Sequence, residues 1–302
     1  MIVDILKVFV AVVEQRNFSR AGEILNLSQP SVSLHIRNLE FEYGAKLLYR
    51  SPKLVKTTAA GDVLYAYAKR ILSLHDEAKE QIHLLEDVVA GLLKIGASLT
   101  IGEYLLPRFL ASFVKQHPQV DVQITIGNTE EIAQGVRHNE LDLGLVEGSV
   151  ALSEFETSPF MKDDLILVAH PDHLLSTQRS VKPDMLQNQT WILRETGSGT
   201  RAFNEDFLRN EGLEMNRSYI FNSSQGVKEA VASGLGIAIL SNWVVRKELS
   251  NGEISKIPLR GKRFTRDFSI IYSKQTSLTM AMKAFMQKLK SDSESTIINP
   301  NG

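Results

Sequence analysis

The stretch FSRAGEILNLSQPSVSLHIRNLE, residues 18–40, decides the fold of the N-terminal region. Ser19 is predicted to cap a first helix, because it precedes apolar residues at the spacing of a buried helical face, namely Ala21, Ile24 and Leu25. After a short break, Ser28 is predicted to cap a second helix with the buried stripe Val32, Ile36 and Leu39. Two helices joined by such a tight turn predict a helix-turn-helix.

The outward face of the second helix carries side chains that suit the major groove of DNA. Small serines let a helix lie deep in the groove, and Gln29 near the helix N-terminus can read a base edge. The hydroxyl of Ser28 and the free backbone amides can hold a phosphate, and Leu34 can contact a thymine methyl. The DNA contacts predicted on this helix are Ser28, Gln29, Pro30, Ser31, Ser33, Leu34 and Arg37.

A basic turn follows the two helices and is predicted to be a wing on the phosphate backbone. It supplies the remaining predicted DNA contacts, Arg50, Lys53, Lys56, Thr57 and Thr58. Residues 28–58 contain five cations and two glutamates, a formal charge of +3, whereas the chain of 302 residues carries −1. The near-neutral average therefore does not exclude nucleic acid. The alternative for this region is a plain helical hairpin with a solvated polar face.

Residues 59–90 read as one long helix with a heptad seam. Apolar residues recur in alternating steps of four and three, with His75 as a polar interruption, at Leu64, Ala68, Ile71, His75, Ala78, Ile82, Leu85 and Val89. A stripe this narrow and long favours self-association, and a dimer supplies the two half-sites that a small DNA reader needs. The alternative is a long helix that packs on its own domain.

From residue 91 onward, short apolar strands alternate with helical segments. The predicted strands are 92–97, 120–126, 142–146, 165–168, 191–193, 219–221, 236–240 and 268–272, with helices over 103–117 and 129–138. Short connections between strand and helix predict parallel sheets covered on both faces. The predicted subdomains cover about 91–162 with 267–290, and 163–266. Ligands are expected at the carboxyl ends of the strands.

Composition and motifs exclude several classes of protein. The chain has no cysteine, so disulfides, thiolate zinc sites and cysteine nucleophiles are excluded. Its apolar runs are too short to span a bilayer and its start lacks the pattern of a signal peptide, so a cytoplasmic protein is expected. No phosphate-binding P-loop, nucleophile elbow, His-Glu-x-x-His or complete dinucleotide fingerprint is present. The segment His170–His173 is expected to be a strand exit rather than a metal site, and no enzyme activity, cofactor or metal is predicted.

The N-terminal residues resemble the winged helix-turn-helix of LysR-type transcriptional regulators. The matching stretches are 18–22, 27–33, 36–40 and the end of the wing at 58–61. Leu34 departs from the arginine that the family often has there, and Thr57 departs from leucine. Leu34 leaves the base preference at its contact open. The resemblance extends over the whole chain and implies an α/β fold with three parts: an all-α winged helix-turn-helix (1–58), a linker and dimerisation helix (59–90), and a periplasmic-binding-protein-like effector domain of two α/β subdomains (91–302).

The resemblance also implies a small effector bound between the two subdomains. The loop Thr196–Arg201 suggests an anion cradle, because two glycines permit close approach, hydroxyls are available and a helix begins near Thr200. A loop whose Ser and Thr merely cap the helix is the alternative. The expected effector-binding residues are Ser98, Thr100, Asn128, Thr129, Glu147, Thr196, Ser198, Thr200 and Arg201.

The expected function is that of a sequence-specific transcriptional regulator controlled by a small anionic metabolite. The subgroup resembles regulators of sulfur or one-carbon assimilation. The expected partners are double-stranded promoter DNA, the metabolite, RNA polymerase and further copies of the chain in a homodimer or homotetramer, with no membrane. The rival from another class is a solute-binding module whose N-terminal helices serve only association, and an α/β enzyme is a third hypothesis.

Overall fold

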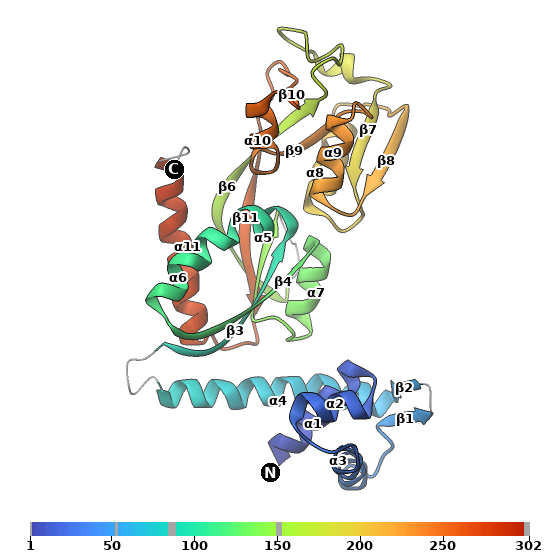
Figure 1. Cartoon of the computed structure of the whole chain (residues 1–302), viewed down its shortest axis with the longest axis vertical. Helices are drawn as coiled ribbons and strands as arrows, with labels where there is room; N and C mark the ends of the chain where they lie inside the picture. Colours follow the sequence, from blue (N-terminus) through green and yellow to red (C-terminus); the bar gives the residue numbers. More distant parts are fainter. Residues whose placement is uncertain (1, 52–53, 84–88, 149–152, 299–302) are drawn as a thin grey trace. The chain divides into compact units, whose positions relative to one another are not determined.

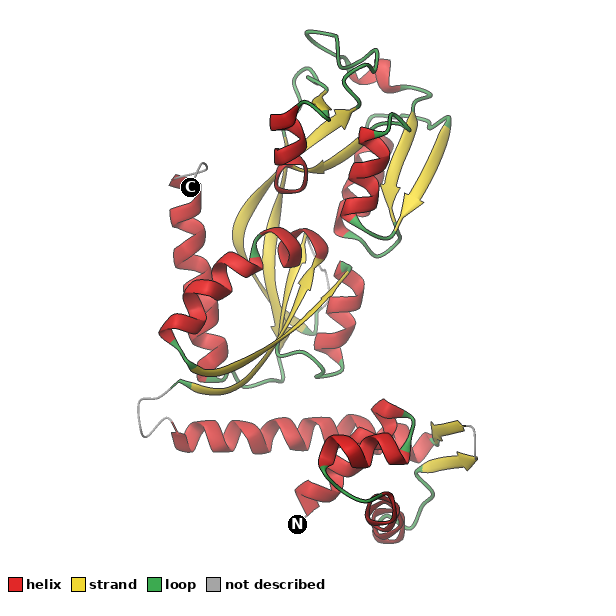
Figure 2. Ribbon diagram, in the orientation of Figure 1, coloured by secondary structure: helices red, strands yellow, loops and turns green. Residues whose placement is uncertain are grey.

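The computed structural model describes residues 2–51, 54–83, 89–148 and 153–298 (Figure 1). The chain divides into two compact units, one built mainly on the first 87 residues and the other on the rest. Helices make up most of the N-terminal unit, whereas the C-terminal unit mixes helices with a large sheet (Figure 2). Within the described residues, no helix is long and apolar enough to cross a membrane.

The N-terminal unit is a winged helix-turn-helix, as predicted. Its elements are α1 (Ile2–Gln15), α2 (Phe18–Leu25), α3 (Gln29–Glu42), β1 (Leu48–Ser51), β2 (Leu54–Thr57) and α4 (Ala59–His83). The antiparallel pair β1–β2 forms the wing. Val32, Ile36 and Leu39 are fully buried, and Ser28 caps α3 by accepting from the Ser31 amide, which confirms both sequence predictions.

Two local predictions for α2 are wrong. Asn17, not Ser19, caps the helix, and its side chain accepts a hydrogen bond from the Arg20 amide. Ile24 is 56% exposed rather than buried. At the other end of the helix Asn26 is left-handed, and the turn to α3 brings Leu27 back over Gly22. A Cβ on Gly22 would lie 2.6 Å from the carbonyl oxygen of Leu27, so the turn requires glycine there.

The long helix α4 does not leave the whole predicted heptad seam on its surface. Leu64 and Ala68 are buried in the core of their own unit, so the alternative of self-packing holds for the start of the helix. The exposed large apolar residues of α4 are Val63, Tyr67, Ile71 and Leu74. The predicted seam position Leu85 lies outside the described residues, and the structure describes no side chain at Ile82.

The C-terminal unit contains a seven-stranded mixed sheet and a separate two-stranded parallel sheet. We call residues 90–162 with 267–298 the first half and residues 163–266 the second half. The first half contains β3 (Ala90–Ser98), α5 (Leu99–Tyr104), α6 (Leu106–Gln116), β4 (Gln119–Gly127), α7 (Thr129–Arg137), β5 (Leu143–Glu147) and α11 (Met280–Ile298). Helices α6 and α11 share one apolar core with the sheet, and α7 contributes to a second (Figure 1).

The second half contains β7 (Thr190–Arg194), α8 (Gly199–Asn210), β8 (Arg217–Phe221), α9 (Ser224–Ala232), β9 (Ala238–Ser241), α10 (Asn242–Asn251) and β10 (Ser255–Lys256), with a short 3₁₀ helix at Pro183–Leu186. It also has apolar cores of its own, one of which includes α8 and the other α9 and α10. Trp191 is fully buried in the first of these cores and contacts the ring of Phe207.

Two long antiparallel strands, β6 (Phe155–Ala169) and β11 (Phe264–Ser273), pass through both halves. The predicted sheets are therefore only partly parallel: β3 pairs parallel with β4 and β5, and β7 with β8, but β6 and β11 run antiparallel to their neighbours. The helix predicted over 103–117 is also two helices, with a break at Leu105, because Pro107 begins a new helical turn. The predicted domain bounds stay a prediction.

Candidate functional site

The carboxylate of Glu147, at the end of β5, is the centre of a buried polar cluster between the two halves. The backbone amide of Thr100, from the first half, donates to Glu147 Oε1 at 3.0 Å. The hydroxyl of Thr200, from the second half, donates to Glu147 Oε2 at 3.0 Å. One buried carboxylate therefore ties the start of α5 to the first turn of α8.

Arg266 completes this cluster from β11, at the place where the chain passes from one half to the other. Its guanidinium lies 2.8 Å from Glu147 Oε2, and its Nε donates to Asp163 Oδ2 at 2.8 Å. Asp163 lies opposite Arg266 in the β6–β11 register and also accepts from the Ser241 hydroxyl at 2.6 Å. All three charged side chains are buried.

The two carboxyl groups respond differently to this shared cation. Burial raises the pKa of Glu147, but the charge of Arg266 and the hydrogen bonds from Thr100 and Thr200 outweigh it, so the net shift is downward. Burial also raises the pKa of Asp163, and here Arg266 and Ser241 compensate only in part, leaving it at about 6. Of the two carboxyl groups, Glu147 is therefore the one that keeps its charge to lower pH.

Several hydrogen-bonding atoms around Glu147 are buried without a partner among the described residues. They are Ser98 Oγ, Thr100 Oγ1, Thr129 Oγ1 and Arg266 Nη2. Buried polar groups in proteins are nearly always satisfied, so unpaired groups concentrated in one place need an explanation. The guanidinium nitrogen can only donate, which calls for an acceptor.

A cavity of about 330 Å³ opens beside this cluster. Thr129, Glu147 and Gly148 line it from the first half, Arg266 from β11, and the loop Thr196–Gly199 with the first turns of α8 from the second half. Gly199 permits the close approach, because a Cβ there would lie 2.4 Å from the carbonyl oxygen of Glu147. The amide of Glu130 donates to the carbonyl of Gly197 at 3.1 Å, which joins the halves again.

The structure brings most of the predicted effector residues together, but in different roles. Thr129, Glu147, Thr196, Ser198 and Arg201 line the cavity. Ser98, Thr100 and Thr200 are buried, and each has a hydrogen bond to Glu147 or an unpaired hydroxyl. Asn128 instead caps α7, by accepting from the Glu131 amide at 3.0 Å.

The cation of the predicted cradle and the neighbouring Arg194 are already engaged. Arg201 donates to Glu205 at 2.6 Å and to the carbonyl of Arg194 at 3.1 Å. Ser198 caps α8 by accepting from the Arg201 amide at 3.4 Å, as the capping alternative predicts. Arg194 is buried and holds Glu195 and Ser224. The sequence interpretation missed Arg266 and Asp163. Their signal is a short run of charged residues inside each strand, 162–164 in β6 and 266–267 in β11.

In the N-terminal unit, α3 presents the predicted polar face to the surface. Leu34 is 53% exposed, and Arg37 is exposed as well. Two intrahelical hydrogen bonds fix this face: Ser28 Oγ lies 2.8 Å from Ser31 Oγ, and Gln29 Nε2 donates to Ser33 Oγ at 2.9 Å. The helix therefore holds its short polar side chains in place.

The wing residues are placed unequally. Lys56 is exposed and Thr57 donates to Asp62. Thr58 is buried, and its hydroxyl donates to the Lys46 carbonyl and accepts from the Gly61 amide, so it is a helix cap with no free hydrogen atom for a phosphate. Lys53 lies outside the described residues, and the structure describes only the backbone of Arg50.

The described part of the chain holds no group of three or more His, Asp or Glu side chains that could bind a metal ion. The imidazole Nδ1 of His170 instead accepts from the Asp172 amide at 3.2 Å. The His170–His173 segment is thus a hydrogen-bonded turn after β6.

The fold and the buried cleft together define a class of protein: a winged DNA reader joined to a ligand-binding unit of two halves. Residues 3–62 match the family described as "Bacterial regulatory helix-turn-helix protein, lysR family", and residues 86–293 match the "LysR substrate binding domain". The chain belongs to the LysR family of transcriptional regulators.

Its relatives are transcriptional regulators rather than enzymes. The chain is 43% identical to "HTH-type transcriptional regulator CysL" of Bacillus subtilis (strain 168), over 99% of this chain and 100% of that protein. It is 33% identical to the "RuBisCO operon transcriptional regulator" of Acidithiobacillus ferrooxidans, over 94% of this chain and 92% of that protein.

Solved structures share the fold. Full-length OxyR from Pseudomonas aeruginosa superposes with a TM-score of 0.77 at 23% identity, over 96% of this chain and 95% of that chain. The Synechocystis CcmR regulatory domain, solved in complex with 2-PG, gives 0.63 at 24% identity, over 68% of this chain and 98% of that chain. These likenesses confirm the predicted fold class.

Proposed function

We propose that a small anion bound between the two halves of the C-terminal unit controls this LysR-type regulator. The unpaired Arg266 Nη2 beside three unpaired hydroxyls carries this proposal, because a carboxylate or oxyanion supplies the acceptors that these donors lack. The N-termini of α7 and α8 add their positive dipole ends on the two sides of the cavity. The charge of the buried Glu147 limits which anions can bind, because it favours a ligand that contacts Arg266 without displacing Glu147.

A thermal-shift screen of small anions tests this proposal. Sulfate, phosphate and small mono- and dicarboxylates are offered to the full chain, and one is expected to raise the melting temperature. The triple variant Ser98→Ala, Thr100→Ala and Ser198→Ala is expected to lose that effect, while Ser218→Ala, an exposed serine on β8, retains it. A stabilising anion whose effect survives the triple variant would refute the proposed site.

We propose that α3 enters the major groove and that the wing holds the phosphate backbone. The exposed Arg37 and Lys56 have no ion pair in the described part of the chain, so both are available to phosphates. On its promoter duplex, Arg37→Ala is expected to weaken binding and to lower the salt slope by about one. Lys283→Ala, an exposed cation of α11, is the matched control. Unchanged affinity and slope in Arg37→Ala and Lys56→Ala would contradict this docking.

The same experiment distinguishes the rival interpretation, in which the N-terminal helices serve only association. A solute-binding module would bind the anion but would prefer no duplex sequence over bulk polyanion. Promoter binding that is specific and responds to the anion excludes the solute-binding module, because such a response requires the anion to bind two states of the regulator with different affinities.

The proposal places this regulator in the cytoplasm, as a dimer or tetramer with RNA polymerase as a further partner. The names of the RuBisCO operon relatives fit the resemblance to one-carbon regulators.

A further inference from the structure

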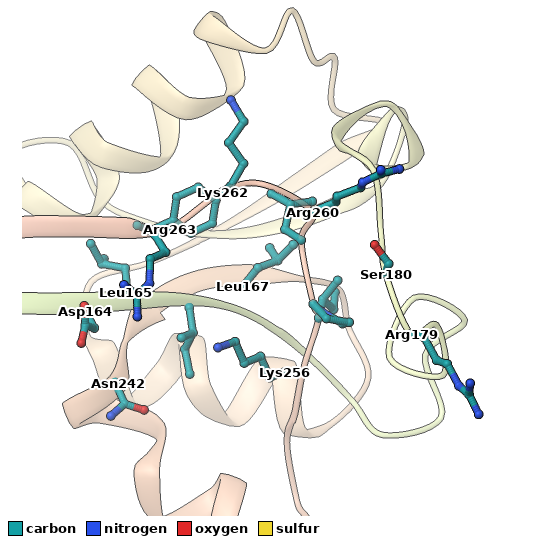
Figure 3. A pocket seen from close by; sticks show the side chains of 15 residues that line it. Asp164, Leu165, Leu167, Arg179, Ser180, Asn242, Lys256, Arg260, Lys262 and Arg263 are labelled. Atoms are coloured by element: carbon teal, nitrogen blue, oxygen red, sulfur yellow. The ribbon is translucent and has the colours of Figure 1, made fainter. Parts of the chain in front are cut away.

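A second cavity, of about 560 Å³, lies in the second half and shares no lining residue with the effector cleft (Figure 3). It forms where strand β6 changes partners. Lys256, the last residue of β10, pairs with Val168 of β6. Phe264, the first residue of β11, pairs with Leu165 of β6. The intervening residues 257–263 leave the sheet and arch around the open edge of β6.

Cations dominate the lining of this cavity. Its charged residues are Arg179, Lys256, Arg260, Lys262 and Arg263 against the single carboxylate Asp164. Lys262 is paired with Glu211 at 2.5 Å, but the other four cations have no ion pair within the described residues. Figure 3 shows Lys256 and Arg263 pointing to the side of the strand where Asp164 and Asn242 lie, while Arg179 and Arg260 extend outward. Unpaired like charges around one cavity repel each other, and an anion relieves this repulsion.

The loop that carries these cations is firmly anchored. The Ile257 amide donates to the Leu167 carbonyl at 2.8 Å, and the Arg260 amide donates to the Val181 carbonyl at 2.8 Å. The Val181 amide in turn donates to the Pro258 carbonyl at 2.9 Å. Val181 and Ile257 are buried, and so are the β6 residues Leu165, Ile166 and Leu167 that line the cavity. The cavity therefore combines a firmly anchored floor with a cationic rim.

We propose that this cavity is a second ligand site, specific for a small organic molecule that carries two or more negative charges. The volume matches that of small-molecule sites, which measure about 300–1,000 Å³. Lys256 and Arg263 hold the anionic groups, and Arg260 and Arg179 add contacts at the rim. A cavity of this volume admits a compact molecule, whereas a rigid duplex lays its phosphates along an extended basic surface.

Isothermal titration of the full chain with inorganic pyrophosphate and with citrate tests the proposal and separates phosphate from carboxylate chemistry. The double variant Lys256→Gln/Arg263→Gln is expected to bind the preferred anion at least 10-fold more weakly, since two charge-assisted contacts are lost. The control Lys283→Gln/Lys290→Gln removes the same charge from exposed positions on α11 and is expected to bind as the wild type does. The triple cleft variant Ser98→Ala, Thr100→Ala and Ser198→Ala is also expected to retain binding at this second site.

Three outcomes would overturn the proposal. The first is equal weakening in the cavity variant and the α11 control, which indicates general charge attraction. The second is loss of pyrophosphate and citrate binding in the triple cleft variant alone, which assigns all anion binding to the cleft. The third is a cavity variant that binds anions normally but loses affinity for promoter duplex, which assigns these cations to DNA. If the double variant fails to fold by circular dichroism, Arg179→Gln/Arg260→Gln on the exposed rim takes its place and must weaken binding.

Discussion

At the scale of single residues, Glu147 is the side chain on which the two halves depend. It receives the Thr100 amide from one half, the Thr200 hydroxyl from the other and the guanidinium of Arg266 between them. Breaking a buried ion pair on one side leaves an uncompensated charge, which costs far more than the pair itself contributes. Glu147 is therefore expected to govern the stability of the unit and, if the proposed anion binds there, the affinity for it.

Replacing Glu147 with glutamine is expected to lower the free energy of unfolding by about 3 kcal/mol, because Arg266 loses a buried partner. The freed guanidinium is then open to an external anion, so anions should stabilise the variant more than the wild type. Urea denaturation with and without sulfate measures both effects. Glu253→Gln, at an exposed position, is the control. A variant as stable as the wild type would contradict the role assigned to Glu147.

The raised pKa of Asp163 predicts that its contribution to the free energy of unfolding depends on pH with the opposite sign to the usual acid destabilisation. Its pKa in the folded chain is about 6, above its ordinary 3.8, so the folded chain binds more protons between these values. Its contribution to stability therefore falls as the pH rises from about 4 to 6. Relative to Asp163→Asn, the wild type is expected to lose about 2 kcal/mol between pH 4.5 and 7.5. Urea midpoints across this range measure it, and a constant difference between the two proteins would contradict the prediction.

At the scale of elements, α4 shows how far sequence patterns reach. The heptads located the helix, but the same residues can face a partner or the domain's own core, and periodicity does not distinguish the two. Leu64 and Ala68 pack inward, which leaves Val63, Tyr67 and Leu74 as the outward stripe. An exposed apolar stripe on a long helix is the kind of surface that a second copy covers.

We therefore expect Leu74→Asp to convert the proposed dimer into a monomer without unfolding the N-terminal unit, because Leu74 is 60% exposed. Analytical ultracentrifugation and circular dichroism measure the two properties. Ala68→Asp is the contrasting variant, since a charge at this fully buried position should unfold the unit. Dimerisation that survives Leu74→Asp together with Tyr67→Asp would place the interface elsewhere.

Local patterns also explain which parts of the site could be predicted. Ser28, Val32 and the cradle loop Thr196–Arg201 are encoded by neighbouring residues, so caps, stripes and glycines revealed them. Arg266 and Asp163 are 103 residues apart in the chain and meet only because β6 and β11 pair across both halves. The antiparallel strands of the mixed sheet escaped prediction for the same reason, since strand direction depends on topology and not on local composition.

At the scale of the whole C-terminal unit, ligand binding should act on both halves at once. The two walls of the cleft come from different halves, with Thr129 on one side and Thr196 to Gly199 on the other. Hydrogen exchange is expected to slow in both walls when the anion binds, because closing the cleft protects amides on each side. Mass spectrometry of exchanged peptides measures this. Protection of one wall alone would contradict binding between the halves.

The path of β6 and β11 also has an evolutionary consequence. The chain leaves the first half at Lys162 and returns at Asp267, which lies opposite in the strand register and only 2.7 Å away across an ion pair. Residues 163–266 are thus inserted between two neighbouring positions, an arrangement that tolerates exchange because both ends fall together. Two crossovers between related genes can replace this whole segment, giving a new wall to the ligand cleft while the DNA-binding unit stays unchanged. A regulator built this way can come to respond to a new effector while it still binds the same operator.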